Sequence, residues 1–513
     1  MQKLLQLRLD VEEYMNVSMF ENILAKKSNI DKNSLSYYCV VKESLDCRKS
    51  PLYNVSVIVS NDNDLPNHKI APLLDIKSNK SVIIVGAGPA GLFAAIKLLQ
   101  HGIKPIIIER GSCIEKRKID VANINRNNEI NTESNICFGE GGAGTFSDGK
   151  LYTRSNKKGN IEEVLEIFVH FGAEEKILRQ THSHIGTDKL SYIIKNMRKE
   201  ILLHGGEYLF DSKVVDFIVK DNTVKGVKIA DKGEVYADKV ILATGHSARD
   251  IYQLFYDRGW KIESQNFAMG VRVEHPQQLI NQIQYHSKYP SSLLPAATYS
   301  LTCNANGRGI FSFCMCPGGI IVPSMDRPNT MVVNGMSNSL RNGEKANAAI
   351  VVSVKEEDAK QFHSYGALSL MMFQQEIEKN MYIHKQIAPG QRITDFMENR
   401  LSSSLVKSSY IPGVESVDMN DMLPKFVCEN LKIGFKNFDK KMRGFITKEA
   451  MLIGLESRTS SPVRITRDVD TLQHLTLKNL YPCGEGAGYS GGITSSAMDG
   501  INIANKIIEQ WGM

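Results

Sequence analysis

The stretch Ser81-Val82-Ile83-Ile84-Val85-Gly86-Ala87-Gly88-Pro89-Ala90-Gly91 decides the fold of this 513-residue chain. It opens with β-branched residues, typical of a buried parallel strand, and an Ala- and Leu-rich segment follows its glycines. A second apolar strand then ends at Glu109, 23 residues after Gly86. This order predicts a Rossmann-type unit, with a dinucleotide pyrophosphate at the helix N-terminus and Glu109 on a ribose. We expect cofactor contacts from Gly86, Gly88, Pro89, Ala90, Gly91, Glu109 and Arg110.

Residues 81–99 are apolar over nearly the roughly 20 residues that span a bilayer. Three glycines, Pro89 and Lys97 interrupt this run, and its composition changes from β-branched to Ala- and Leu-rich. The pattern is that of strand, turn and helix in a soluble domain. We therefore expect no membrane association.

The bulk composition is that of a soluble globular protein, with 42% hydrophobic and 23% charged residues. The net charge of +6 comes without a dense basic block, which argues against a nucleic-acid partner. The charge run at residues 115–118 is expected to be a solvated face. Nine cysteines, odd in number and irregularly spaced without a signal peptide, favour a cytoplasmic protein with reduced thiols. The pair Cys314 and Cys316 is expected in a core strand or near a functional site.

Two further segments separate FAD from NAD as the dinucleotide. One ends a buried strand at Ala243-Thr244-Gly245, and the other opens a helix near the C-terminus. FAD is a long molecule, so it needs backbone donors beyond the first glycine loop. We expect non-covalent FAD to be held there by Ala243, Thr244, Gly245, Gly484, Glu485, Gly486, Gly492 and Ile493, with Val215 beside it.

A glycine-rich loop covers residues 139–149, with five glycines in eleven residues. The glycines therefore indicate a close approach of the backbone. It approaches either the flavin end of FAD or only other atoms of a tight structural turn. We expect FAD contacts from Gly141, Gly142, Gly144, Thr145 and Ser147. Asp148 and Lys150 are either reactive neighbours of the ring or a solvent-side ion pair.

The glycine segments predict an α/β fold in several parts. Residues 1–76 are expected to form a small N-terminal α+β domain. The Rossmann-type FAD-binding domain then covers residues 77–260 and returns at 449–513, and residues 261–448 form an inserted α+β cap or substrate domain. Within the cap, residues 348–362 are expected to be a helix.

The three cofactor segments resemble flavoproteins of the glutathione-reductase-like superfamily, in which the residue at Glu485 is more usually Asp. A wider resemblance rests on the motifs at 138–151, 184–190, 270–276, 313–319 and 458–464. It identifies the chain as a member of a bacterial family of FAD-dependent dehydrogenases that carry a small N-terminal domain. The resemblance implies oxidoreductase chemistry without naming a substrate.

The sequence indicates the catalytic residues less strongly than it indicates the cofactor loops. His184 could transfer a proton near neutral pH, or could be a packed histidine. Arg458 and Arg464 are forked donors for a carboxylate or a phosphate, or interdomain ion-pair partners. His182 and His184 have ligand-like spacing, but nothing completes a coordination shell, so no metal is expected. The catalytic candidates are His184, Asp148, Lys150, Arg458 and Arg464.

The resulting functional hypothesis is an FAD-dependent oxidoreductase that transfers a hydride between flavin and an organic substrate, anionic if the arginines bind it. The sequence contains no second dinucleotide fingerprint, so NAD(P)H is expected only as a transient electron donor. Two alternatives remain open at this stage. One is a flavin-dependent RNA-modifying protein, and the other is a flavin-binding sensor without turnover.

Overall fold

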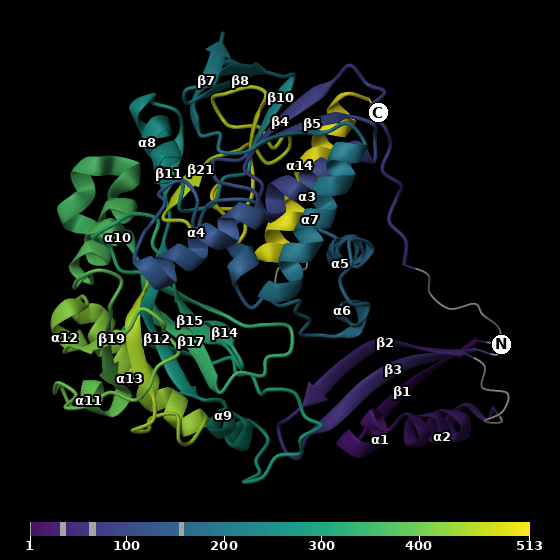
Figure 1. Ribbon diagram of the computed structural model, residues 1–513, viewed down its shortest axis with the longest axis vertical. Helices are drawn as coiled ribbons and strands as arrows, with labels where there is room; N and C mark the ends of the chain where they lie inside the picture. The colour runs from purple at the N-terminus through teal and green to yellow at the C-terminus, as the bar shows by residue number, and fades with distance from the viewer. Residues whose placement is uncertain (1, 31–36, 61–67, 153–158, 513) are drawn as a thin grey trace.

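Figure 1 shows the computed structural model of the chain, which describes residues 2–30, 37–60, 68–152 and 159–512. Its elements form three regions, each built on a sheet of its own. The composition of residues 61–67 also predicts a polar turn, but this segment lies outside the described residues. None of the described helices is both long and apolar enough to span a bilayer.

The predicted nucleotide-binding region is a five-stranded parallel sheet in the order β22-β10-β4-β5-β6. Helices α3, α7 and α14 cover one face, where α3 and α14 pack along each other. An antiparallel three-stranded sheet and helix α8 cover the other. The bounds are β4 Ser81–Val85, α3 Pro89–Leu99, β5 Lys104–Ile108, α7 Thr187–Leu203, β6 Glu207–Leu209, β7 Val214–Lys220, β8 Thr223–Ile229, β9 Gly233–Tyr236, β10 Lys239–Leu242, α8 Arg249–Asp257, β22 Leu480–Pro482 and α14 Ile493–Gln510.

The second region is a seven-stranded, mostly antiparallel sheet, with helices α10 (Ser369–Asn380) and α13 (Lys425–Lys441) beside it. Its central strands are almost completely buried because side chains pack on both faces. In spatial order, the strands are β13 Thr302–Ala305, β14 Arg308–Cys316, β17 Lys345–Val354, β12 Phe267–Pro276, β20 Met451–Glu456, β18 Ala388–Arg392 and β19 Val414–Ser416.

Two expectations about this region need correction. Residues 348–362 were expected to be a helix, but β17 occupies the first part and a 3₁₀ segment, Glu356–Leu368, the second. Alanines in β17 read as helix formers, yet the strand is central in the sheet, where small residues fit between two packed faces. Strand β20 also pairs with β12 in this sheet. We therefore place the return to the nucleotide-binding part after Glu456 rather than at residue 449.

The N-terminal region is a three-stranded antiparallel sheet in the order β1-β3-β2, with helix α2 (Val17–Ser28) packed on it. Strands β1 (Gln2–Leu9) and β3 (Leu52–Ser60) alternate buried and exposed residues, as a sheet with one packed face requires. Strand β2 (Tyr37–Asp46) contacts the short helix α6 (Lys176–Arg179), and Thr181 donates its backbone N–H to Glu43 O at 3.1 Å. This region thus packs against the rest of the chain near residue 181.

Candidate functional site

A cavity of about 750 Å³ runs between the parallel sheet and the cap sheet, and is called the central cavity below. It is open enough and large enough for a cofactor-sized ligand. No described residue before Val85 lines it, so the N-terminal sheet lies outside its wall. Its lining includes the first glycine turn, the 139–149 loop, the end of β10, the start of α14 and the cap strands β14 and β16 (Val333–Met336).

The first glycine turn has the geometry of a phosphate cradle. Gly86 has φ +110°, and a Cβ on it would lie 2.6 Å from Ala243 O, so this turn packs directly on the end of β10. A Cβ on Gly91 would lie 2.0 Å from Gly86 O, so helix α3 must approach its own turn closely. Gly88 is the N-cap of α3 and faces the cavity. Backbone N–H groups and the helix dipole are therefore presented to an anion there.

The glycines that face the cavity leave space rather than filling it. A Cβ on Gly88 would meet only Gly142 Cα, at 3.7 Å, and a Cβ on Gly245 or Gly492 would meet no described atom within 4 Å. Side chains at these positions would project into the cavity. The residues thus fit an elongated dinucleotide that contacts three separate stretches of backbone.

Glu109 and Arg110, predicted from their place after β5, both line the cavity. The buried Glu109 carboxylate accepts backbone N–H groups from Ala87 at 2.8 Å and from Gly111 and Gly139 at 2.9 Å. It therefore fastens the 139–149 loop to the first glycine turn and also faces the cavity. Arg110 is held by ion pairs to Glu133 and Asp250 and stacks over Phe138.

Arg117 organises the glycine loop from behind, and the expectation of a solvated face at residues 115–118 is wrong for it. Its side chain is completely buried in helix α4 (Ile114–Asn127). The guanidinium donates to the carbonyl oxygens of Asn135, Ile136, Gly139, Glu140 and Gly142. Five carbonyls on one cation fix the loop in a single shape.

Not every residue predicted from the loops reaches the cavity. Gly142, Gly144 and Ser147 line it, as do Ala243, Thr244, Gly245, Glu485, Gly492 and Ile493. Gly141 and Thr145 instead pack on each other, since a Cβ on Gly141 would lie 2.2 Å from Thr145 Oγ1. Gly91, Gly484 and Gly486 shape the backbone behind the wall. Val215 is exposed and outside the lining, because strand alternation turns Val214 inward in its place.

Of the catalytic candidates, Asp148 and Lys150 line the cavity. Asp148 makes a two-pronged ion pair with Arg341, and Lys150 Nζ donates to Met315 O on β14. The solvent-side ion pair between Asp148 and Lys150 is therefore wrong, because Asp148 is buried and has Arg341 as its partner.

His184 and Arg464 stay outside the cavity lining. His184 Nε2 lies 3.2 Å from Ser339 O, and burial followed by the charge of Arg341 lowers the pKa of this histidine to about 4. Arg464 Nε donates to Gln265 Oε1 at 2.9 Å. Two other histidines line the cavity instead. One is His182, two residues before His184 in the chain. The other is His246, whose Nδ1 lies 3.0 Å from Glu485 Oε1. No sequence pattern distinguishes these histidines, because loop packing decides which of them reaches the cavity.

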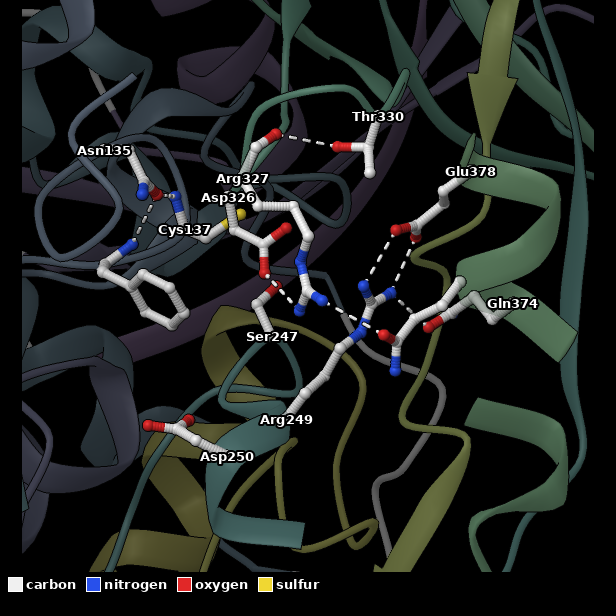
Figure 2. A network of polar contacts seen from close by, with 12 residues as sticks. Asn135, Cys137, Ser247, Arg249, Asp250, Asp326, Arg327, Thr330, Gln374 and Glu378 are labelled. Atoms are coloured by element: carbon white, nitrogen blue, oxygen red, sulfur yellow. Dashed lines mark hydrogen bonds and ion pairs between the residues drawn. The ribbon is translucent and has the colours of Figure 1, made fainter. Parts of the chain in front are cut away.

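Arg458 lines the cavity from within a buried ionic network that joins the two large sheets. Its Nη2 pairs with Asp326 at 2.5 Å and with Glu378 at 3.2 Å. Glu378 also binds Arg249 from helix α8 at 2.8 Å, and Gln374 adds a second acceptor, as Figure 2 shows. The charge of Arg458 is thus already matched by protein carboxylates. The interdomain ion-pair interpretation holds for this arginine.

Residues that sequence reasoning missed include Arg341, which lies in a turn with no motif of its own, and Tyr299. The Tyr299 hydroxyl is buried at the cavity wall without a hydrogen-bond partner among the described residues. Among those residues, His68, Glu162 and Glu166 are the one group close enough to share a metal ion. None of the three lines the cavity.

Family models and individual proteins both match this chain. Residues 80–255 match the model described as pyridine nucleotide-disulphide oxidoreductase, residues 266–459 the model "FAD-dependent protein, C-terminal domain-like", and residues 1–60 a domain of unknown function. An uncharacterized protein of Clostridium beijerinckii is 39% identical over 532 residues, covering 99% of this chain and 98% of its own length.

Two more distant matches are a reductase and an oxidase. Digeranylgeranylglycerophospholipid reductase of Haloferax volcanii is 30% identical over 176 residues, 33% of this chain and 36% of that protein. The crystal structure of glycine oxidase from Bacillus cereus aligns with a TM-score of 0.31 at 13% identity, over 84% of this chain and 96% of that one. The full-length relative and the two flavoprotein models agree with the glycine cradle around the cavity, and the chain therefore belongs to a bacterial family of FAD-dependent oxidoreductases.

Proposed function

We propose that this oxidoreductase is a dehydrogenase or reductase whose organic substrate enters the central cavity beneath the cap sheet. One observation carries the proposal: a single cavity of about 750 Å³ reaches from the phosphate cradle to strands β14 and β16 of the cap. A cofactor held along the cradle thus shares its space with the cap wall. FAD bound there would supply hydride-transfer chemistry, and the protein supplies binding, orientation and electrostatics.

The cofactor-holding residues are those whose backbone or side chain faces the cavity. Gly86, Gly88, Pro89 and Ala90 would hold the pyrophosphate, and Glu109 the adenosine ribose. The 142–147 segment, Thr244, Gly245, Gly492 and Ile493 would hold the remainder of the molecule. Arg117 and Glu109 keep the loop preorganised, so little conformational entropy is lost on binding.

His246 replaces His184 as our candidate for proton transfer. It lines the cavity, and its Nδ1 faces Glu485 Oε1 at 3.0 Å. A carboxylate at one ring nitrogen fixes the ring's orientation and leaves Nε2 to hold or accept a proton. By contrast, Arg458 pairs with Asp326 and Glu378, and Arg249 pairs with Glu378 and Gln374, so both arginines position the wall rather than bind substrate.

Anaerobic flavin reduction tests this proposal. Purified protein with confirmed FAD content is mixed with a library of metabolites, and with NADH and NADPH separately, while flavin absorbance near its visible maximum is followed. We expect one class of metabolite or nicotinamide to bleach the protein-bound flavin but not free FAD. If no reductant acts while illumination with EDTA still reduces the flavin, the protein binds flavin without turnover and the proposal is wrong.

A further inference from the structure

The arginine and lysine side chains on the wall of the central cavity pair with carboxylates, with one exception. Arg110 and Lys213 share Glu133 and Asp250, Arg341 pairs with Asp148, and Arg458 pairs with Asp326 and Glu378. Lys150 also lines the cavity, yet it forms no ion pair with any residue that the structure describes. An ammonium group that is partly withdrawn from water and unmatched by a carboxylate favours an anion beside it.

Lys150 is held in place by the cap. Its ammonium donates to Met315 O, and the neighbouring carbonyl of Cys314 accepts from both Nη atoms of the buried Arg272, at 3.2 and 3.3 Å. These bonds fix a bulge in β14, where Cys314 adopts a positive φ of 42°. Only one of the three ammonium donors of Lys150 is used by this contact, so others remain for a ligand.

The charges around Lys150 balance one another and leave its own charge unmatched. Arg341 donates hydrogen bonds from Nε and Nη2 to Asp148, and its Nη1 has no partner among the described residues. Partial burial, then the charges of Lys150 and Arg341, lower the pKa of His182. This histidine is therefore neutral near pH 7 and offers a hydrogen bond without adding charge. Lys150 and Arg341 with Asp148 leave an excess of one positive charge.

The position of this charge separates it from the phosphate cradle. Gly88, at the cradle, lies beside Gly142, whereas Lys150 is eight residues further along the loop and reaches the cap strand β14. The Tyr152 ring packs edge-on against the His182 ring, with centroids 4.8 Å apart. It thus gives the Lys150 end of the cavity an aromatic wall. The cofactor's phosphates thus have their own site, and this end is left for another ligand.

We propose that Lys150, Arg341 and His182 form a subsite for the carboxylate of the substrate, here called the carboxylate subsite. A single negative charge balances the excess of one positive charge, which a phosphate dianion would overshoot. Hydrogen bonds from the ammonium, Nη1 and the imidazole suit the two carboxylate oxygens. The inference rests on the proposed function, because it assigns the substrate class of the same cavity.

Benzoate serves as the probe, since it combines one carboxylate with a ring that can lie against Tyr152. FAD content is measured first, because a protein without flavin would contradict the proposed function and not this inference alone. Benzoate, benzyl alcohol and phenyl phosphate are then titrated into the FAD-loaded wild-type protein by calorimetry, with flavin difference spectra as a second readout. We expect saturable binding of benzoate, no binding of benzyl alcohol, and weaker binding of phenyl phosphate.

The matched variants are Lys150→Met, Lys150→Arg and, as a control on helix α6 outside the cavity, Lys176→Met. Lys150→Met should weaken benzoate binding by roughly thirtyfold or more, since it removes a partner of a desolvated ion pair. Lys150→Arg should keep most of the affinity, and Lys176→Met should change nothing. The wild-type titrations need no variant, so they decide the matter even if Lys150→Met does not fold.

Three results would overturn the carboxylate subsite. Equal binding of benzoate and benzyl alcohol would show that charge is not recognised, and tighter binding of phenyl phosphate would show that the class is wrong. In the third, Lys150→Met shifts the flavin's midpoint potential while benzoate affinity stays at the wild-type value. The ammonium would then serve the cofactor and not a substrate anion.

Discussion

Gly88 is the position at which cofactor binding can be separated from the protein's own packing. Its backbone has φ −80°, which any residue adopts, and a Cβ would touch only Gly142 Cα at 3.7 Å. Gly88→Val should therefore fold, yet place its methyl groups where the pyrophosphate approaches. We expect colourless protein with a native far-ultraviolet circular dichroism spectrum and a lowered Tm, because bound FAD no longer adds stability.

Gly88→Ala is the graded control, since one methyl group should weaken FAD binding less than the branched side chain. FAD content is measured by the absorbance ratio at visible and ultraviolet wavelengths after gel filtration. Full occupancy of Gly88→Val would mean that the pyrophosphate does not lie at this turn. Gly91→Val is not an equivalent test, because a Cβ there would lie 2.0 Å from Gly86 O and would disturb the fold itself.

Single residues also show what the sequence could and could not supply. The glycines were predictable because their role depends on local backbone geometry, which a strand-turn-helix pattern encodes. Arg117 and Arg341 were not, because each depends on partners more than ten residues away in the chain. A sequence identifies such a residue as charged but not as buried. The error at Val215 is of a related kind, because the alternation of inward and outward residues in its strand was misplaced by one position.

At the level of elements, strand β12 contains a histidine whose protonation should lower the stability of the cap at acid pH. His275 is completely buried, its Nε2 donates to Phe445 O at 2.8 Å, and its Nδ1 has no partner in the described chain. Burial lowers the pKa of His275 to about 4, although the Phe445 bond opposes this. The unfolded chain takes up this proton near pH 6.5 and the folded chain only near pH 4. Stability contributed by the neutral ring is thus complete above pH 6.5 and lost as the pH falls toward 4.

Between pH 6 and pH 5 this one group should lower the free energy of unfolding by about 1.2 kcal/mol, close to the limiting slope for one proton. Urea unfolding at several pH values measures the slope in the wild type and in His275→Gln, which has no such titration. We expect a shallower acid slope in the variant, whatever its stability at pH 7. Equal slopes would show that His275 is not the group responsible, and His184, whose pKa is also lowered, would then be tested alone.

The elements themselves were predicted unevenly. Strand β4, helix α3, strands β5, β7, β8 and β10, and helix α2 with strands β1 and β3 of the N-terminal region follow from periodicity and glycine signals, whereas β2 was not predicted. Strand β17 was mistaken for a helix because alanines dominate its first half, and only its place between β12 and β14 explains them. Propensity is a weak guide where both faces of a strand are buried.

For the whole molecule, the ionic network around Glu378 is a buried polar link between the parallel sheet region and the cap (Figure 2). Arg249 and Arg458 come from segments beside the parallel sheet, while Asp326 and Glu378 come from the cap. Burial opposes ionisation of Glu378, but the two guanidinium groups prevail and lower its pKa to about 2. The carboxylate is therefore charged at neutral pH, and the cavity wall depends on it.

Glu378→Gln should leave two buried arginines with Asp326 as their one remaining carboxylate in the described network. Removing one partner of a buried ion pair costs about 3–5 kcal/mol, because the remaining charge is uncompensated. We expect a lower Tm, looser packing between the two regions, and faster tryptic cleavage at the cap with FAD release at lower urea. Glu376→Gln on the same helix α10 is the matched control, since Glu376 has no ion pair among the described residues. If both variants melt alike, the network does not hold the cap to the parallel sheet region, and the cavity wall must be maintained by apolar packing alone.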